Sequence, residues 1–221
     1  MTNTLRKKEA FISVVLVDIS NSSVKLKDYL KTLEQYLTPR YTDYEIIVID
    51  QKSKEDSSKD VPTILSNIPS VRWLNLSFAV SLEVSISAGV ENAIGDYVVV
   101  IRPSQDPVDL IESLIEKASE GYEVVVGVSK NQVPVLYKYV RHLGNQILKS
   151  IDYSLPKNAT PARCLSRLAI NTILQTGKPN HQFFMKASKT GYATSTIEYC
   201  TENNLTDSKS VFSGIRQTLY L

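Results

Sequence analysis

Residues 95–107 read GDYVVVIRPSQDP, and this stretch indicates how the rest of the chain folds. The five consecutive apolar or aromatic residues from Tyr97 to Ile101 predict a strand that is covered on both faces. Pro103 ends the strand because proline has no amide hydrogen to donate, and Asp106-Pro107 predicts the cap and first position of a helix. Ligands of open α/β sheets bind at the carboxyl ends of strands, so the residues after this strand are candidates for binding.

Strand and helix patterns alternate on both sides of this stretch. We expect strands at residues 11–19, 44–50, 71–76, 97–101 and 122–128. We expect helices between them at residues 24–37, 62–68, 81–94 and 107–119, and we expect Gly121 to end the last helix as a left-handed cap. This alternation is typical of a mostly parallel, doubly wound α/β sheet.

The alternation stops after residue 128. The later pattern predicts a long helix at 133–151, a polar loop at 152–163, helices at 166–176 and 181–190, a strand at 192–199, and a polar turn before a final helix. We therefore expect a C-terminal extension of helices and a strand on the α/β core. Residues 1–10 are expected to be a disordered lead-in, and residues 11–221 to form one domain.

Length and composition limit the classes of protein. The 221 residues are 43% hydrophobic, enough for one sizeable core. The 25 basic and 23 acidic residues give no argument for nucleic-acid binding, and two histidines do not supply a histidine-rich zinc site. Cys164 and Cys200 lack motif spacing and are expected to be reduced thiols of a cytoplasmic protein. No apolar run reaches the roughly 18 residues of a membrane span, and residues 1–9 lack the apolar core of a signal peptide.

An ordered series of segments resembles the glycosyltransferase family 2. The segments are ISVVLV (12–17), YEIIVID (44–50) followed by a serine, AGVENAIGDYVVVI (88–101), DPVDLI (106–111) and YEVVVGV (122–128). ATPARCLSR (159–167), with residues 197–199 and 208–209, resembles the dolichyl-phosphate mannose synthase branch. The resemblance covers about residues 11–212. It implies the GT-A fold, with a nucleotide-binding half at 11–128 and an acceptor-side half and tail at 129–221.

The resemblance also implies two sets of site residues. The donor-binding set is Asp50, Ser53, Arg102 and Ser104. The set that would bind an acceptor or its phosphate is Lys130, Arg163, Arg167, Ser208 and Lys209. Two interpretations stay open for four of them: Arg163 and Arg167 either face that phosphate or pair with nearby acids, and Ser208 and Lys209 either belong to the site or are a helix cap and a surface lysine. No catalytic residue is assigned. Departures from the family pattern concentrate at strand ends: residues 19–20, 51–52, 79–81, 102–104, 129, 203 and 206. The apolar strands and the structural glycines Gly89 and Gly95 are kept.

The most informative departure lies where the family carries Asp-x-Asp, whose carboxylates hold a divalent metal against the donor diphosphate. Here Arg102-Pro103-Ser104 stands in that place. An arginine cannot ligate a metal, and a serine hydroxyl is a weak neutral ligand, so no metal or other cofactor is predicted. Two readings of Arg102 stay open: it binds the diphosphate itself, or it pairs with Asp106 or Asp109. Asp50 likewise either contacts a nucleobase or caps the turn after its strand.

Two functional hypotheses follow. The leading one is a GT-A domain of glycosyltransferase ancestry that has lost normal catalysis and acts in binding or assembly in a glycan pathway. Its partners would be a nucleotide or nucleotide-sugar and either a second copy or an active glycosyltransferase. The alternative is an active, metal-independent glycosyltransferase in which Arg102 replaces the metal. A receiver or flavodoxin-like domain is disfavoured because the chain lacks the acidic cluster of the receiver and a glycine-rich phosphate loop.

Overall fold

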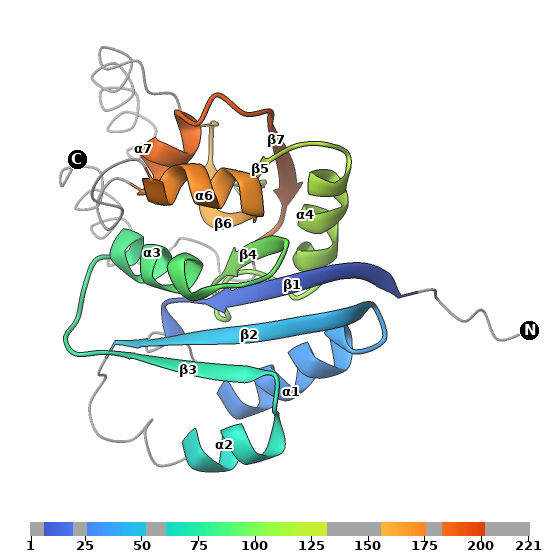
Figure 1. Ribbon diagram of the computed structural model, residues 1–221, viewed down its shortest axis with the longest axis vertical. Coiled ribbons are helices and arrows are strands. Elements are labelled where there is room, and N and C mark those ends of the chain that lie inside the picture. The colour runs from blue at the N-terminus through green and yellow to red at the C-terminus, as the bar shows by residue number, and fades with distance from the viewer. Residues whose placement is uncertain (1–6, 20–25, 52–60, 132–155, 176–182, 202–221) are drawn as a thin grey trace, which may run out of the picture.

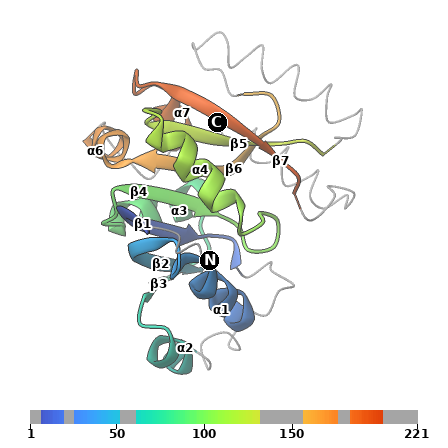
Figure 2. The ribbon, with the colours of Figure 1, turned by 90° about the vertical axis from the view of Figure 1, so that its right-hand side faces the viewer.

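The computed structural model describes residues 7–19, 26–51, 61–131, 156–175 and 183–201. Within them, seven strands form one sheet in the order β3-β2-β1-β4-β6-β5-β7 (Figures 1 and 2). The strands are β1 (Lys8–Leu16), β2 (Tyr41–Gln51), β3 (Val71–Leu76), β4 (Tyr97–Ile101), β5 (Val124–Ser129), β6 (Ala159–Ser166) and β7 (Thr194–Tyr199). The helices are α1 (Leu26–Leu37), α2 (Val61–Asn67), α3 (Leu82–Asn92), α4 (Leu110–Ser119), α6 (Arg167–Gln175) and α7 (Phe183–Ser188).

The expected mostly parallel sheet with helices on both faces is confirmed. All neighbouring strands pair in parallel except β6, which is antiparallel to both β4 and β5. Apolar runs bury alternate side chains on opposite faces, as in β1, where Val14 and Leu16 join one core cluster and Val15 the other. Helices α1, α2 and α4 cover the first face, and α3, α6 and α7 cover the second.

The expected polar loop at 152–163 is wrong over its last five residues. Ala159–Ser166 is a strand in the interior of the sheet, flanked by β4 and β5. Pro161 and Arg163 interrupt its apolar pattern, and its strand character depends on ladders with two strands more than 25 residues away in the sequence. The helix expected from 166 begins at Arg167. The helix expected at 133–151, residues 152–155 and the polar turn and final helix lie outside the described residues.

Two other boundaries differ from the expectation. β1 begins at Lys8, so residues 8–10 of the expected lead-in belong to the sheet. α4 begins at Leu110, not at Pro107, and Asp106 is not its cap. Gly121 does end this helix with the left-handed φ of 101° that the sequence predicts, and its amide donates to the Ala118 carbonyl over 3.0 Å.

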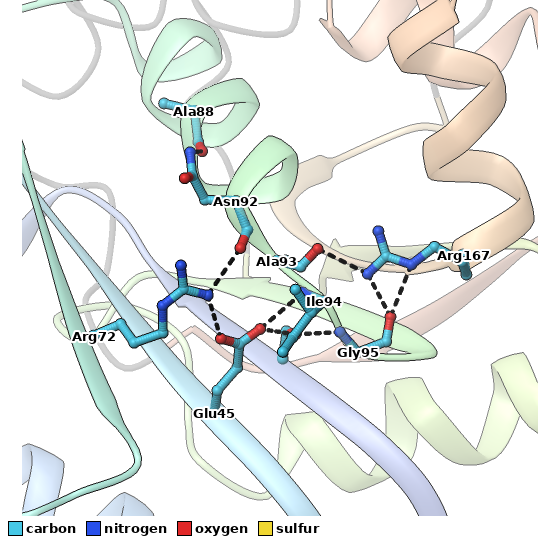
Figure 3. A network of polar contacts seen from close by, with 9 residues as sticks. Glu45, Arg72, Ala88, Asn92, Ala93, Ile94, Gly95 and Arg167 are labelled. Atoms are coloured by element: carbon cyan, nitrogen blue, oxygen red, sulfur yellow. Dashed lines mark hydrogen bonds and ion pairs between the residues drawn. The ribbon is translucent and has the colours of Figure 1, made fainter.

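A polar network locks the turn between α3 and β4 at the edge where the parallel strands begin (Figure 3). The buried carboxylate of Glu45 accepts hydrogen bonds from Ser13 Oγ (2.6 Å), the Ile94 amide (2.9 Å) and an Arg72 Nη (2.7 Å). The Arg72 guanidinium also donates to the Asn92 carbonyl, at the end of α3. Cationic side chains at a helix carboxyl end satisfy free carbonyls and complement the helix dipole, so this network fixes where α3 ends.

Candidate functional site

The carboxyl ends of four parallel strands bring the predicted donor residues to one edge of the sheet. The register aligns Leu16 of β1 with Val48 on one side and Ile101 on the other. Asp50 lies two residues beyond Val48, and Arg102 follows Ile101 directly. The structure therefore places Asp50 and Arg102 at the same edge with β1 between them. Two strand spacings of about 4.8 Å put their backbones about 10 Å apart.

Asp50 is buried at this edge and only half of its carboxylate is engaged. Its Oδ2 accepts a hydrogen bond from Trp73 Nε1 over 3.3 Å. Its Oδ1 is buried and has no hydrogen-bond partner among the described residues. An unsatisfied buried carboxylate oxygen is costly, so Oδ1 is suited to accept from an N–H or O–H group of a ligand. The alternative, a cap on the following turn, concerns residues 52–60, which lie outside the described part of the chain.

Gln51 ties the end of β2 to the start of α3. Its Nε2 donates to Ser85 Oγ, and its Oε1 accepts from the Val80 amide over 3.1 Å. Ser81 caps α3, with its Oγ accepting from the Val84 amide over 3.4 Å. The sequence showed Gln51 only as a departure from the family pattern. Two sequence features could have indicated that Gln51 contacts α3: the strand ends in a polar residue, and the helix begins with the serines Ser81 and Ser85.

Asp18 is a second residue at this edge that the sequence did not single out. It lies two residues past the end of β1, where the Val17 amide donates to the Ile101 carbonyl over 3.2 Å. Its backbone has a φ of 58°, in the left-handed region that non-glycine residues seldom occupy. Such strained positions cluster at ligand sites.

Arg102 is anchored to a buried carboxylate. Its amide donates to Asp106 Oδ2 over 2.8 Å, and its Nε lies 3.5 Å from the same oxygen. The side chain of Asp106 is fully buried, and that of Arg102 is 13% exposed. Of the two acids that the sequence offered as partners, the structure pairs Arg102 with Asp106. Asp106 thus stabilises the turn after β4 through its side chain and is not the expected helix cap.

Tyr199 at the end of β7 completes this cluster. Its hydroxyl donates to Asp106 Oδ1 over 2.5 Å and lies 2.9 Å from Thr160 Oγ1 of β6. Burial and the neighbouring Asp106 carboxylate raise the pKa of Tyr199 above its ordinary value. The phenol therefore stays protonated as a donor across the physiological pH range. We name Arg102, Asp106, Tyr199 and Thr160 the Arg102 cluster.

The residues at the end of β4 do not fit a divalent cation. Mg²⁺ and Mn²⁺ prefer several oxygen ligands, including carboxylates. The end of β4 offers the guanidinium of Arg102 and the buried hydroxyl residue Ser104, and both oxygens of the nearby Asp106 are already engaged. Within the described residues, no group of three or more His, Cys, Asp and Glu side chains is arranged to hold a metal ion.

The structure separates the predicted acceptor residues. Lys130 follows β5 at the edge that also holds Asp50 and Arg102. Its side chain is more than half exposed, and its Nζ lies 3.9 Å from Glu198 Oε2. Arg163 is buried near this edge, with its guanidinium 3.8 Å from the Phe184 ring centroid, and it donates to the Thr160 carbonyl over 3.3 Å. Arg167 lies at the opposite edge. Ser53, Ser208 and Lys209 lie outside the described residues.

Arg167 has a structural role at that opposite edge. Its guanidinium donates to the Ala93 carbonyl over 2.9 Å and through Nε to the Gly95 carbonyl over 3.1 Å (Figure 3). β6 runs antiparallel to its neighbours, so the residue that follows it emerges where β4 begins. Arg167 therefore lies at the edge opposite to Lys130 and Arg102.

Two depressions of about 300 Å³ each lie away from this site. They share Thr42 and Asp43, at the edge where β1 and β2 begin, and one also contacts Asp96. None of the predicted site residues lines either depression.

Comparison with known proteins gives the ancestry. The family model described as glycosyl transferase family 2 matches residues 15–174. An uncharacterized glycosyltransferase of Synechocystis sp. is 26% identical over 176 residues, which cover 78% of this chain and 55% of that protein. A prophage bactoprenol glucosyl transferase homolog of Escherichia coli is 23% identical, with 84% of this chain and 62% of the relative covered. The chain thus spans little more than half the length of these relatives.

The solved structures agree on the fold. Glucosyl-3-phosphoglycerate synthase from Mycobacterium tuberculosis, in complex with Mn²⁺, UDP-glucose and phosphoglyceric acid, superposes with a TM-score of 0.62 at 13% identity. The match covers 95% of this chain and 77% of that structure. In the part of the chain that the structure describes, no helix combines the length and apolarity needed to cross a bilayer. The family match over most of the chain and the shared sheet lead to one conclusion: the chain belongs to the glycosyltransferase family 2 and has the GT-A fold.

Proposed function

We propose that this chain is a sugar-nucleotide-binding domain that has lost the metal-assisted transfer of its family and serves as a binding or assembly partner in glycan synthesis. One observation carries the proposal. Asp50, which we assign to the nucleoside, keeps a buried and unengaged acceptor oxygen. Arg102, which we assign to the diphosphate, presents a guanidinium where the family resemblance implies carboxylates. A cation placed beside Arg102 would find no free carboxylate oxygen on Asp106, because Oδ1 accepts from Tyr199 and Oδ2 accepts from the Arg102 amide.

The ligand class follows from the chemistry of Asp50. Its free Oδ1 calls for an N–H or O–H donor, which a nucleobase imide or a ribose hydroxyl supplies. A structural neighbour holds UDP-glucose, and this supports a sugar nucleotide as the ligand. A cytoplasmic location belongs to the same proposal, because both cysteines are free thiols. The partner is proposed to be a second copy of this chain or an active glycosyltransferase.

The competing function is an active, metal-independent glycosyltransferase of the same donor class. It is favoured by the fixed position of Arg102, whose permanent charge could stabilise a leaving diphosphate as a metal does. The two functions differ in turnover and not in donor binding. Typical enzymes turn over between about 1 and 1,000 times per second, so a chain that binds donor but transfers or hydrolyses no sugar on this scale fits the first function.

Trp73 gives a direct test, because it is the only tryptophan of the chain and donates to Asp50. Titration with UDP, GDP and their sugar conjugates in excess chelator is expected to change its fluorescence. Asp50→Asn should lose this response, whereas Asp43→Asn, an exposed aspartate at the start of the same strand, should keep it. Sugar transfer or hydrolysis at an ordinary enzymatic rate would refute the loss of catalysis. If that turnover needed no metal but needed Arg102, the competing function would hold.

A further inference from the structure

We propose that the Arg102 cluster is a metal-independent phosphoryl-binding site in which Asp106 and Tyr199 act as positioning residues for Arg102. This inference rests on the proposed function, since the phosphoryl group would belong to the bound sugar nucleotide. It goes further by assigning roles to Asp106 and Tyr199, and by stating that the phosphate contact is made by a prearranged guanidinium.

The first step is the orientation of the arginine. Its buried Nε lies 3.5 Å from Asp106 Oδ2, within ion-pair distance, but makes no hydrogen bond. Its two terminal Nη nitrogens make no hydrogen bond or ion pair with any described residue. The unengaged donors therefore lie at the far end of the guanidinium from its anchor. Two parallel N–H groups in one plane match two oxygens of a phosphoryl group.

The second step is the rigidity of the anchor. Asp106 cannot turn away readily, because Oδ1 accepts from Tyr199 and Oδ2 accepts from the Arg102 amide. The Asp106 amide in turn donates to the Arg102 carbonyl over 2.9 Å, which closes the turn. Tyr199 of β7, which itself contacts Thr160 of β6, thus fixes the side chain of Asp106 in the turn after β4. An exposed arginine loses rotamer freedom when it binds, whereas this side chain is 13% exposed and paired with Asp106, so part of that freedom is already lost on folding.

The third step is the distance to Asp50. The two residues leave neighbouring positions of one sheet edge, about 10 Å apart across β1. An extended nucleoside diphosphate bridges a gap of that order between its base or ribose and its phosphates. The Asp106 carboxylate offsets the charge of Arg102, so the site acts through fixed donors more than through net charge. We therefore expect its salt dependence to be shallow.

The test is a ladder of ligands measured by calorimetry in excess chelator: uridine and guanosine, their monophosphates and diphosphates, and inorganic pyrophosphate. In the wild-type chain the matching diphosphate should bind at least about tenfold more tightly than its nucleoside, one tenfold step being about 1.4 kcal/mol. Arg102→Lys keeps the positive charge but removes the paired N–H groups of the guanidinium, and it should abolish the gain in affinity of the diphosphate over the nucleoside. Tyr199→Phe should reduce the gain severalfold and leave nucleoside affinity unchanged, a split that general destabilisation would not produce.

Two controls keep the result specific. Tyr192→Phe removes a hydroxyl that lies near Thr172 and not near the site, and Lys117→Gln removes one positive charge from the far end of α4. Both should retain the wild-type gain. The inference is overturned, and the proposed function survives, if nucleosides bind but phosphates add nothing, or if Arg102→Lys and Tyr199→Phe match the wild type. If pyrophosphate binds through Arg102 while no nucleoside binds, the proposed function fails and the inference holds. If nothing binds, both fail.

Discussion

Glu45 is the residue whose removal should damage the fold most clearly. The residue is 4% exposed, and its carboxylate accepts hydrogen bonds from Ser13, Ile94 and Arg72 at 2.6–2.9 Å. Glu45→Ala leaves the Ile94 amide without its acceptor and uncouples Arg72 from β2. Breaking a buried ionic group in this way costs about 3–5 kcal/mol. The Arg72 side chain is 47% exposed, so solvent screens its share, and most of the loss comes from the buried Ser13 hydroxyl and the part-buried Ile94 amide.

The assay is urea and thermal unfolding followed by circular dichroism. At about 2–4 °C per kcal/mol for a domain of this size, the midpoint of Glu45→Ala should fall by roughly 6–20 °C. Glu45→Gln keeps one oxygen acceptor and should lose only about 1–2 kcal/mol. Glu91→Ala on the exposed side of α3 serves as the control and should stay within about 0.5 kcal/mol of the wild type. A Glu45→Ala chain within about 1 kcal/mol of wild type would refute the reasoning that this network holds the start of β4.

Three further predictions concern other parts of the fold. Gly95→Ala should cost several kcal/mol in urea unfolding, because a Cβ there would lie 2.7 Å from the Phe11 carbonyl oxygen and the Ser13 amide; a midpoint equal to wild type would contradict the close approach. Burial raises the pKa of Glu112, but hydrogen bonds from Tyr36 and Arg40 outweigh burial and leave that pKa below 4.5. The contribution of Glu112 to the free energy of unfolding is therefore present above about pH 4.5 and is lost as the pH falls through the folded pKa. Glu112→Gln should make the free energy of unfolding depend less on pH in this acidic range, and an unchanged pH dependence would refute the assignment. A thiol reagent should label Cys200 rapidly and Cys164 only after unfolding, because Cys164 is fully buried and burial raises its pKa; rapid labelling of two thiols in the native chain would count against the buried β6.

Local patterns in the sequence sufficed for the parallel part of the sheet. The apolar runs of β2, β4 and β5 predict buried strands. Because ligands bind at the carboxyl ends of such strands, the sequence alone also predicts that Asp50 and Arg102 lie at a common edge. The family resemblance rests on the same runs in the same order. These features are readable because each depends on residues adjacent in the chain.

The features that the sequence did not show depend on distant pairings. β6 contains Pro161 and Arg163 and becomes a strand because β4 and β5 pair with it on both sides. The Asp106-Pro107 pair looks like a helix start, yet the partner that determines the role of Asp106 is Tyr199, 93 residues away. The family resemblance placed Arg167 in the acceptor set, and the sequence pattern predicted neither β6 nor its direction. An antiparallel strand carries its last residues to the opposite edge.

We propose that this glycosyltransferase family 2 scaffold binds a sugar nucleotide without a cation. The most direct measurement is the affinity for the best-bound nucleoside diphosphate, taken by calorimetry once in excess chelator and once with millimolar Mn²⁺. We expect the two dissociation constants to agree within about twofold. A manganese-dependent gain of tenfold or more, accompanied by transfer or hydrolysis of the corresponding sugar nucleotide, would contradict it.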